Sequence, residues 1–295
     1  MDVLTSMSIF RRVAETENFS VVAREMGLSQ PTVSKQVAAL EKHLNVKLIN
    51  RSTRQLSLTE VGKQYYQRCV HILDEIAECE SKTRNQQSQP TGMLRINTPV
   101  TFGELKIEQH LWKFLEDYPE LKIDLIMDDH YVDLVKQGVD VAIRVGPLTD
   151  SSLIARKIGT SPRVTVASPQ YLKKNGEPKS PHELSSHNCI VYMLLATLNE
   201  WHFDGPKGKE SVQVSGRFSV NNPRIIREAV LADQGIAVTP IWLMEEYIKS
   251  GQVTVILQDY KPTPLEIHAL YPARRFVPAK VRHFIDYLEA KLAME

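Results

Sequence analysis

The sequence has few cysteines and no long apolar run. Cys69, Cys79 and Cys189 are scattered over 295 residues, too few and too far apart for a disulfide framework. No apolar run approaches the roughly 18 residues needed to cross a bilayer, and Asp2 stands where a secretory signal would carry positive charge. These absences predict a cytoplasmic protein without membrane contact.

The sequence also lacks the short motifs of common catalytic and metal sites. It contains no G-x-S-x-G nucleophile elbow, no phosphate-binding P-loop and no H-E-x-x-H zinc motif. His182, His187 and Cys189 stand close together, but their spacing matches no common zinc site, and a solvated loop is the simpler interpretation. We therefore expect no catalytic residue, no metal and no cofactor.

Positive charge is local rather than general. The net charge of the whole chain is only +1, so any nucleic-acid-binding surface must come from a cluster. Between residues 28 and 58, Glu41 is the only acid. The basic residues of this segment are Lys35, Lys42, Lys47, Arg51 and Arg54, with His43 if it is protonated. Such a local excess suits contacts with DNA phosphates.

The first sixty residues have the pattern of a helix-turn-helix. Apolar residues recur every three positions from Leu4 to Val13 and predict a first helix. Ser20 is the expected N-cap of a short second helix over residues 21–26, which ends at Gly27. A third helix after a turn that contains glycine would complete the motif.

The third helix is expected over about residues 30–44, with Ser29 as its cap and Pro31 in its first turn. In a helix-turn-helix, the N-terminal residues of the second helix of the motif reach base edges in the major groove. The polar face here consists of Gln30, Thr32, Ser34, Lys35 and Gln36. Such side chains bind base edges or phosphates, although a small helical bundle with a polar outer face would show the same spacing.

Two short strands are expected after the third helix, over residues 47–50 and 55–58. They would form a hairpin wing with Arg51 and Arg54 at its tip, which suits the DNA backbone or the minor groove.

The run FSVVAREMGLSQPTVSKQV, residues 19–37, resembles the signature of LysR-type transcriptional regulators, as do residues 40–41, 48–54 and 58–62. Asn50 stands where that family more often has a residue such as Gln, a departure that affects none of the expected contacts. The resemblance implies a winged helix-turn-helix whose DNA contacts come from Ser20, Gln30, Pro31, Thr32, Ser34, Lys35, Gln36, Arg51, Thr53 and Arg54.

A long helix is expected from residue 60 to about 87, with Thr59 as its cap. Its apolar seam has spacings of 4, 3, 4, 3 and 4 and consists of Tyr65, Cys69, Ile72, Ile76, Cys79 and Thr83. A narrow stripe of this kind favours a partner helix, although it could also pack on its own domain. The resemblance implies the same pairing of two subunits. We expect a homodimer, and a homotetramer built from it, on a pseudo-palindromic double-stranded DNA site.

Strand and helix patterns alternate after Gly92 and predict a parallel sheet with helices on both faces. Residues 94–103, 140–146, 166–172 and 235–240 resemble pieces of the LysR-type effector domain. That resemblance implies a periplasmic-binding-protein-like fold of two subdomains, so the chain is α+β overall.

The expected domains follow these patterns, and a composition of 42% hydrophobic and 24% charged residues suits globular domains. They are the winged helix-turn-helix (1–59), the dimerising linker helix and hinge (60–89) and the effector-binding domain (90–295). The two subdomains of the last are expected at about 90–162 with 267–295, and at about 163–266.

A ligand cleft is expected at the carboxyl ends of the strands of the effector domain. The candidate residues, each of which could instead serve ordinary loop capping, are Thr98, Val100, Thr101, Phe102, Arg144, Gly146, Asn221, Thr239 and Pro240. The segment 98–102 precedes a helix, where free N–H groups and the helix dipole favour an anion. We therefore expect a small organic effector, with a carboxylate as the candidate class.

The sequence thus predicts a DNA-binding transcription regulator whose oligomer arrangement responds to a small molecule. The alternatives are a solute-binding protein and an α/β enzyme that uses the C-terminal half. The absence of a signal peptide and the extra N-terminal domain argue against the first alternative, and the absence of catalytic motifs argues against the second.

Overall fold

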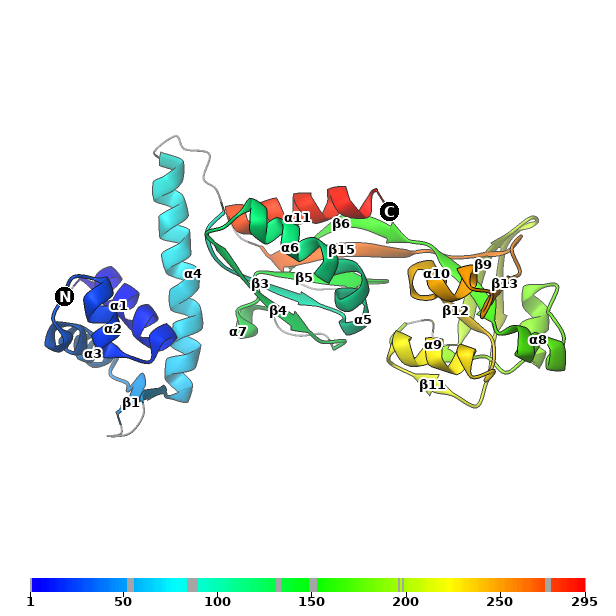
Figure 1. Cartoon of the computed structure of the whole chain (residues 1–295), viewed down its shortest axis with the longest axis horizontal. Helices are drawn as coiled ribbons and strands as arrows, with labels where there is room; N and C mark the ends of the chain where they lie inside the picture. The colour runs from blue at the N-terminus through cyan, green and yellow to red at the C-terminus, as the bar shows by residue number, and fades with distance from the viewer. Residues whose placement is uncertain are drawn as a thin grey trace. The chain divides into compact units, whose positions relative to one another are not determined.

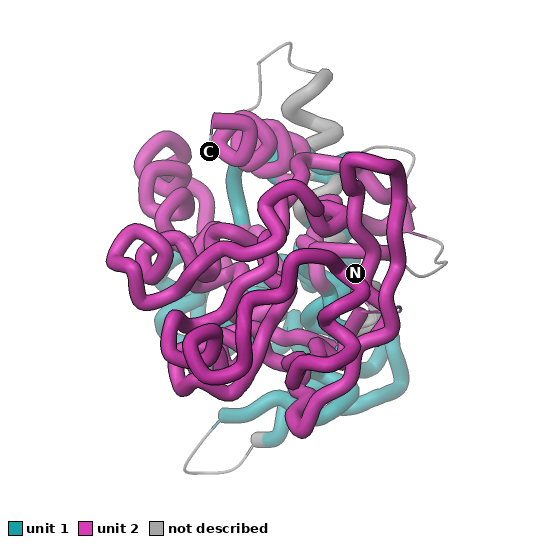
Figure 2. Tube along the Cα trace, turned by 90° about the vertical axis from the view of Figure 1, so that its right-hand side faces the viewer, with its two compact units in different colours: residues 1–92, 135–138, 276–280 teal, residues 93–134, 139–275, 281–295 magenta. Residues whose placement is uncertain are grey.

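The computed structural model forms two compact units, one made mainly of residues 1–92 and the other mainly of residues 93–295 (Figures 1 and 2). We call them unit 1 and unit 2. The residues described are 2–51, 56–83, 90–130, 134–148, 153–195, 197, 199–273 and 277–294. The mixed content of helix and sheet confirms the expected α+β class.

Unit 1 has the predicted order of three helices, a hairpin and a long helix. Its elements are α1 (Val3–Thr16), α2 (Phe19–Glu25), α3 (Gln30–Leu44), β1 (Ile49–Arg51), β2 (Leu56–Leu58) and α4 (Glu60–Thr83). The strands β1 and β2 pair antiparallel, with Ile49 opposite Leu58. The predicted third helix is confirmed at both ends, and the wing hairpin is confirmed with its first strand shifted toward Arg51.

The helix caps explain where these elements begin. The Ser29 hydroxyl accepts a hydrogen bond from the Thr32 N–H (3.3 Å), as predicted for α3. Our prediction of Ser20 as the cap of α2 is wrong. Asn18 is the cap, since its side-chain oxygen accepts the N–H groups of Ser20 (2.9 Å) and Val21 (3.2 Å), and the helix starts two residues earlier than predicted.

Thr59 and Gly62 join the wing to α4. The Thr59 hydroxyl donates to the Lys47 carbonyl (2.7 Å) and accepts from the Gly62 N–H (2.9 Å), which confirms Thr59 as the cap of α4. A Cβ at Gly62 would lie 2.0 Å from the Leu48 carbonyl oxygen, so only glycine allows this close approach.

The apolar seam of α4 is used partly within unit 1. Cys69 is fully buried in the core of this unit, and the Tyr65 ring packs against the Phe10 ring with 5.7 Å between their centroids. The prediction that these two residues face a partner helix is therefore wrong, because α1 covers them. Ile72, the next member of the seam, is 44% exposed.

A buried carboxylate links α3 to the wing. Glu41 is 3% exposed, and one of its oxygens accepts the N–H groups of Leu48 (2.9 Å) and Ile49 (3.1 Å). Its other oxygen accepts from the Lys47 ammonium (3.3 Å). Burial by itself would raise the pKa of Glu41, but the two N–H groups and Lys47 together hold that pKa below its ordinary value.

Unit 2 contains two groups of elements, which we call the first and second lobes. The first lobe contains β3 (Gly92–Thr98), α5 (Val100–Phe102), a π-helical segment (Gly103–Ile107), α6 (Glu108–Asp117), β4 (Leu121–Met127), α7 (Leu134–Gln137), β5 (Val141–Val145), β6 (Leu153–Ser161), β15 (Leu265–Pro272) and α11 (Ala279–Leu292). Its five-stranded sheet has the order β4-β3-β5-β15-β6. The helices α6 and α11 lie together over this sheet (Figure 1), where the Phe114 and Phe284 rings meet with 5.6 Å between centroids.

The first-lobe sheet is mixed rather than parallel, which corrects our prediction. The strands β3 and β5 pair parallel, but β15 returns from the second lobe and pairs antiparallel with both β5 and β6. The strand β6 was not predicted.

The second lobe holds the elements between β6 and β15. They are β7 (Arg163–Ala167), α8 (Pro169–Asn175), a 3-10 helix (Pro181–Ser186), β8 (Val191–Tyr192), β9 (Glu200–Gly205), β10 (Gly208–Gln213), β11 (Ser219–Val220), α9 (Pro223–Leu231), β12 (Ala237–Pro240), α10 (Ile241–Lys249), β13 (Thr254–Ile256) and β14 (Lys261–Pro262). At the centre of its main sheet, β7 pairs antiparallel with both β12 and β13. The chain passes between the lobes twice, from β6 into β7 and from β14 into β15.

We predict that Glu41→Ala destabilises unit 1 by at least about 2 kcal/mol, because two buried N–H groups lose their acceptor at about 1–3 kcal/mol each. All three tryptophans lie in unit 2. Unit 1 is therefore followed by amide hydrogen exchange at Leu48 and Ile49, which should accelerate. Lys47→Ala is the matched control, since it removes only the exposed ion-pair partner, and equal acceleration in both variants would contradict this assignment.

The same carboxylate predicts a pH dependence. Because the pKa of Glu41 is lowered in the folded protein, its stabilising effect is present above the ordinary pKa of 4.5 and is lost as pH falls through the lower, folded pKa. The midpoint of acid unfolding of unit 1 should therefore shift toward neutral pH in Glu41→Gln, because this variant lacks the stabilisation that the ionised carboxylate supplies. An unchanged midpoint would show that other groups control the transition.

Candidate functional site

The exposed N-terminal part of α3 carries most of the polar side chains predicted to contact DNA. Gln30, Pro31, Thr32 and Lys35 are exposed, while the Thr32 hydroxyl also pairs with Ser29 (2.8 Å). Ser20 is exposed in the first turn of α2. These positions form one candidate surface, which we call the reader surface.

Gln36 and Ser34 differ from the other predicted readers. Both are partly buried, and the Gln36 side-chain oxygen accepts a hydrogen bond from the Ser6 hydroxyl of α1 (2.9 Å). This bond ties α3 to α1, so Gln36 has a positioning contact within the unit. The wing residues Thr53 and Arg54, and the side chain of Arg51, lie outside the described residues.

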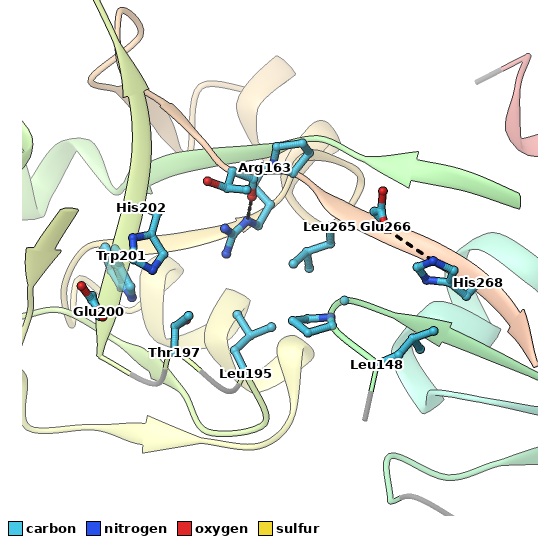
Figure 3. A pocket seen from close by; sticks show the side chains of 14 residues that line it. Leu148, Arg163, Leu195, Thr197, Glu200, Trp201, His202, Leu265, Glu266 and His268 are labelled. Carbon is cyan, nitrogen blue, oxygen red and sulfur yellow. Dashed lines mark hydrogen bonds and ion pairs between the residues drawn. The ribbon is translucent and has the colours of Figure 1, made fainter. Parts of the chain in front are cut away.

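Unit 2 contains two adjoining cavities between its lobes. The smaller and more enclosed one, about 70 Å³, is here called the inner pocket. Its lining comes from both lobes and includes Thr101, Phe102, Asp129, Tyr192, Leu195, Thr239, Pro240, Trp242, Arg163 and Leu265. The outer pocket, about 380 Å³, shares Arg163, Leu195 and Leu265 with it, and its other lining residues include Gly146, Glu200, Trp201, His202, Glu266 and His268 (Figure 3).

The structure brings together five of the nine residues predicted for the cleft. Thr101, Phe102, Thr239 and Pro240 line the inner pocket, and Gly146 lines the outer pocket. The residues that line neither cavity are Thr98, Val100, Arg144 and Asn221. Arg144 is buried, and its guanidinium donates to the Ile143 carbonyl (2.7 Å).

The argument for an anion at the helix start near residue 100 needs correction. The Val100 N–H is not free, because it donates to the Asp129 carboxylate (2.9 Å). Asp129 therefore already places a negative charge at this helix end, where the dipole favours one. A second anion at the same point would be repelled by Asp129.

Three aromatic residues line the inner pocket, and sequence reasoning missed two of them. The Phe102 and Trp242 rings meet edge to face with 5.7 Å between centroids, and the indole N–H donates to the Ser161 hydroxyl (2.9 Å). Burial, with a contribution from Asp129, raises the pKa of Tyr192 to about 12, so this phenol stays neutral. We call Phe102, Tyr192 and Trp242 the aromatic wall.

Two threonine hydroxyls in the inner pocket have no hydrogen-bond partner among the described residues. Thr101 is 2% exposed and Thr239 is 1% exposed, and the side-chain oxygen of each is unpaired. Buried hydroxyls without a partner are uncommon because each loses its bonds to water on folding. This pair of hydroxyls, which we call the threonine pair, suits a polar group of a bound molecule.

Arg163 is the cation of both pockets, and the sequence analysis missed its role. It is the first residue of β7, where it lies opposite Pro240 of β12. Its Nε donates to the Thr263 carbonyl (2.6 Å), and its guanidinium points into the outer pocket (Figure 3). Burial lowers the pKa of Arg163 to about 10, so the group remains charged at neutral pH.

No metal cluster of His, Cys, Asp and Glu occurs among the described residues, and none of the described helices has the length and hydrophobicity to span a membrane. Burial raises the pKa of Cys69 to about 11 and that of Cys189 to about 12, so both thiols are unreactive at neutral pH.

The chain matches two family models. Residues 4–63 match the model described as bacterial regulatory helix-turn-helix protein, lysR family, and residues 87–293 match the LysR substrate binding domain. The HTH-type transcriptional activator AaeR of Escherichia coli (strain K12) is 36% identical over 290 residues, which are 98% of this chain and 93% of the activator.

Solved full-length structures are similar to the chain along almost its whole length. CrgA, a LysR-type transcriptional regulator from Neisseria meningitidis, is 31% identical with a TM-score of 0.61, and the match covers 98% of both chains. The Vibrio cholerae virulence activator AphB is 32% identical with a TM-score of 0.59, and the match covers 97% of this chain and 98% of AphB.

We predict that Thr101→Val and Thr239→Val each leave the stability of unit 2 unchanged or raise it by about 1 kcal/mol when no ligand is present. Each substitution replaces an unpaired buried hydroxyl with a methyl group, and the volume of the side chain stays similar. Thermal unfolding followed by tryptophan fluorescence measures this. Ser168→Ala is the control and should destabilise, since the Ser168 hydroxyl caps α8 and bonds to Asp233. Destabilisation by either valine would mean that its hydroxyl has a partner.

Proposed function

Because the chain belongs to the LysR-type family of bacterial transcriptional regulators, we propose that unit 1 reads an operator and that the inner pocket holds the effector. Members of this family bind DNA and small-molecule effectors and form oligomers, and this chain is a DNA-binding transcription regulator of that kind, not an enzyme. A solute-binding protein is not favoured, since the helix-turn-helix model matches residues 4–63.

One observation supports this assignment of roles most strongly. The same chain presents an exposed polar helix start in unit 1 and, in unit 2, an enclosed cavity with unpaired hydroxyls. The first suits a surface that binds DNA, and the second, together with the adjoining outer pocket of about 380 Å³, suits a cavity that binds a small molecule. We infer domains at 1–59, 60–89 and 90–295, with α4 as the linker.

The reader surface would lie in the major groove, with Gln30 and Thr32 at base edges and Lys35 at a phosphate. Ser20 would contact the DNA backbone from α2. Gln36 supports this surface through its bond to Ser6. The wing residues Arg51, Thr53 and Arg54 remain proposed contacts to the backbone or minor groove.

A homodimer would present two reader surfaces to a pseudo-palindromic duplex, and a homotetramer would present four. The exposed Ile72 belongs to the part of the α4 seam that unit 1 leaves uncovered. We infer that this part, rather than Tyr65 and Cys69, contacts a partner helix. A ligand that binds one arrangement of the oligomer better than another would shift the population between them.

The effector is proposed to be a small organic carboxylate. The charge that would hold it is that of Arg163, not the helix start at residue 100, where Asp129 already stands. The cytoplasm is the proposed location, since a regulator works where its operator is.

We predict that Lys35→Ala weakens binding to an operator duplex selected from random sequence by about tenfold and lowers the slope of log affinity against log salt by about 1, because one phosphate contact is lost. Fluorescence anisotropy over a salt series measures both quantities.

Lys42→Ala is the matched control. Lys42 is also exposed on α3 and has the same charge, but it is seven residues, or about 10 Å, further along the helix axis. It should weaken binding less than Lys35→Ala. Equal effects would indicate a general charge effect, and unchanged binding in Lys35→Ala would contradict the proposed reader surface.

A further inference from the structure

Arg163 is a partly buried cation without a carboxylate partner among the described residues. Its Nε donates to a neutral acceptor, the Thr263 carbonyl oxygen (2.6 Å). Other arginines of unit 2 are paired: Arg95 with Asp124 (3.1 Å) and Arg227 with Glu228 (2.9 Å). Burial lowers the pKa of Arg163. A desolvated charge of this kind is stabilised when an anion binds it.

Three acids line the two pockets with Arg163; Glu200 lies on the far side of Trp201 from Arg163 in Figure 3, and the other two have partners of their own. Glu266 pairs with Lys157 (2.6 Å) and with His268 (3.4 Å), as Figure 3 shows for His268. Asp129 accepts the Val100 N–H. Among the described residues neither carboxylate forms an ion pair with Arg163, so its guanidinium can bind an anionic ligand in the pocket.

The position of Arg163 connects the two cavities. It lines both the inner and the outer pocket, and its bond to Thr263 fixes it between the two segments that pass between the lobes. An anion at its guanidinium would leave the rest of a ligand facing the aromatic wall. The unpaired hydroxyls of the threonine pair line the same inner pocket as that wall.

We propose that Arg163 selects the charge of the effector, which is a monocarboxylate with an apolar or aromatic body and a second polar group. The carboxylate accepts hydrogen bonds from the guanidinium, the body packs against the aromatic wall, and the second polar group meets the threonine pair. This proposal rests on the proposed effector role of the inner pocket and names the class of molecule that the pocket takes.

A monoanion fits the charges better than a dianion. Arg163 supplies one positive charge, and Asp129 in the same lining already accepts the Val100 N–H at the helix start (2.9 Å). A phosphate monoester or a dicarboxylate would therefore carry one uncompensated charge into a partly buried site.

The test compares acids with neutral amides of the same shape. Benzoate, 3-phenylpropanoate and hexanoate are each paired with the corresponding primary amide and titrated into the full-length protein, with binding measured by calorimetry and by tryptophan fluorescence. We expect at least one acid to bind, and to bind at least about tenfold more tightly than its amide, because charge-assisted hydrogen bonds are the stronger ones. Amides that bind as tightly as acids, or the absence of binding by all three acids, would overturn the proposal.

Two variants assign the effect to Arg163. Arg163→Gln should lower the affinity for the acid at least about tenfold and abolish the preference over the amide, whereas Arg163→Lys should keep part of that preference. Unchanged acid binding in Arg163→Gln would overturn the proposal. The wild-type comparison of acid and amide remains decisive if Arg163→Gln does not fold.

Phosphate monoesters are tested alongside the acids, and phenyl phosphate binding more tightly than benzoate would also overturn the proposal. Failure of these tests is distinct from failure of the proposed function. Operator binding and its dependence on Lys35 are measured without any ligand, and they would stand if Arg163 had no role.

Discussion

The arrangement of unit 1 depends on one buried carboxylate. Glu41 accepts the N–H groups of Leu48 and Ile49 and so fixes the start of the wing to the middle of α3. The two elements proposed to contact DNA thereby acquire one relative orientation, which a flexible loop between them would not supply. Glu41 is the one acid between residues 28 and 58, and it is paired with Lys47 and two backbone N–H groups rather than exposed on the surface proposed to bind DNA.

In unit 2 the comparable constraint is the inner pocket, where buried polar groups lack partners among the described residues. Within the described part of the chain, this pocket has two hydroxyls without partners and a cation without a carboxylate partner, beside aromatic rings from both lobes. The hydroxyls and the cation cost stability in the ligand-free protein, because buried polar groups and charges lose their hydration. A ligand that satisfied them would bind the form in which both lobes line the pocket. The binding free energy would then favour one arrangement of the lobes.

The sequence correctly predicted the features that depend on neighbouring residues, such as the starts of α3 and α4. Ser29 and Pro31 set the start of α3, and Thr59 sets the start of α4, because caps depend on neighbouring residues alone. Asn18 and Ser20 both suit an N-cap, and spacing could not choose between them. The seam of α4 was assigned to a partner because periodicity shows that a face is buried and not what covers it. The strand β6 was missed because many of its residues are exposed, so it has no clear apolar alternation. Arg163 begins a strand, and only the pairing of β7 with β12 places it beside the pocket.

The two strands that lead between the lobes limit how the lobes can move. The strands β6 and β15 pair along eight residues of β15, and a bulge between Ile267 and His268 leaves Ile158 without an opposite residue. A hydrogen-bonded ladder resists stretching and sliding, whereas a bulge increases local twist. Rotation of one lobe about the axis of this ladder is therefore easier than separation of the lobes. An effector held at Arg163, beside the end of the ladder, would change the rotation angle between the lobes more readily than the distance between them.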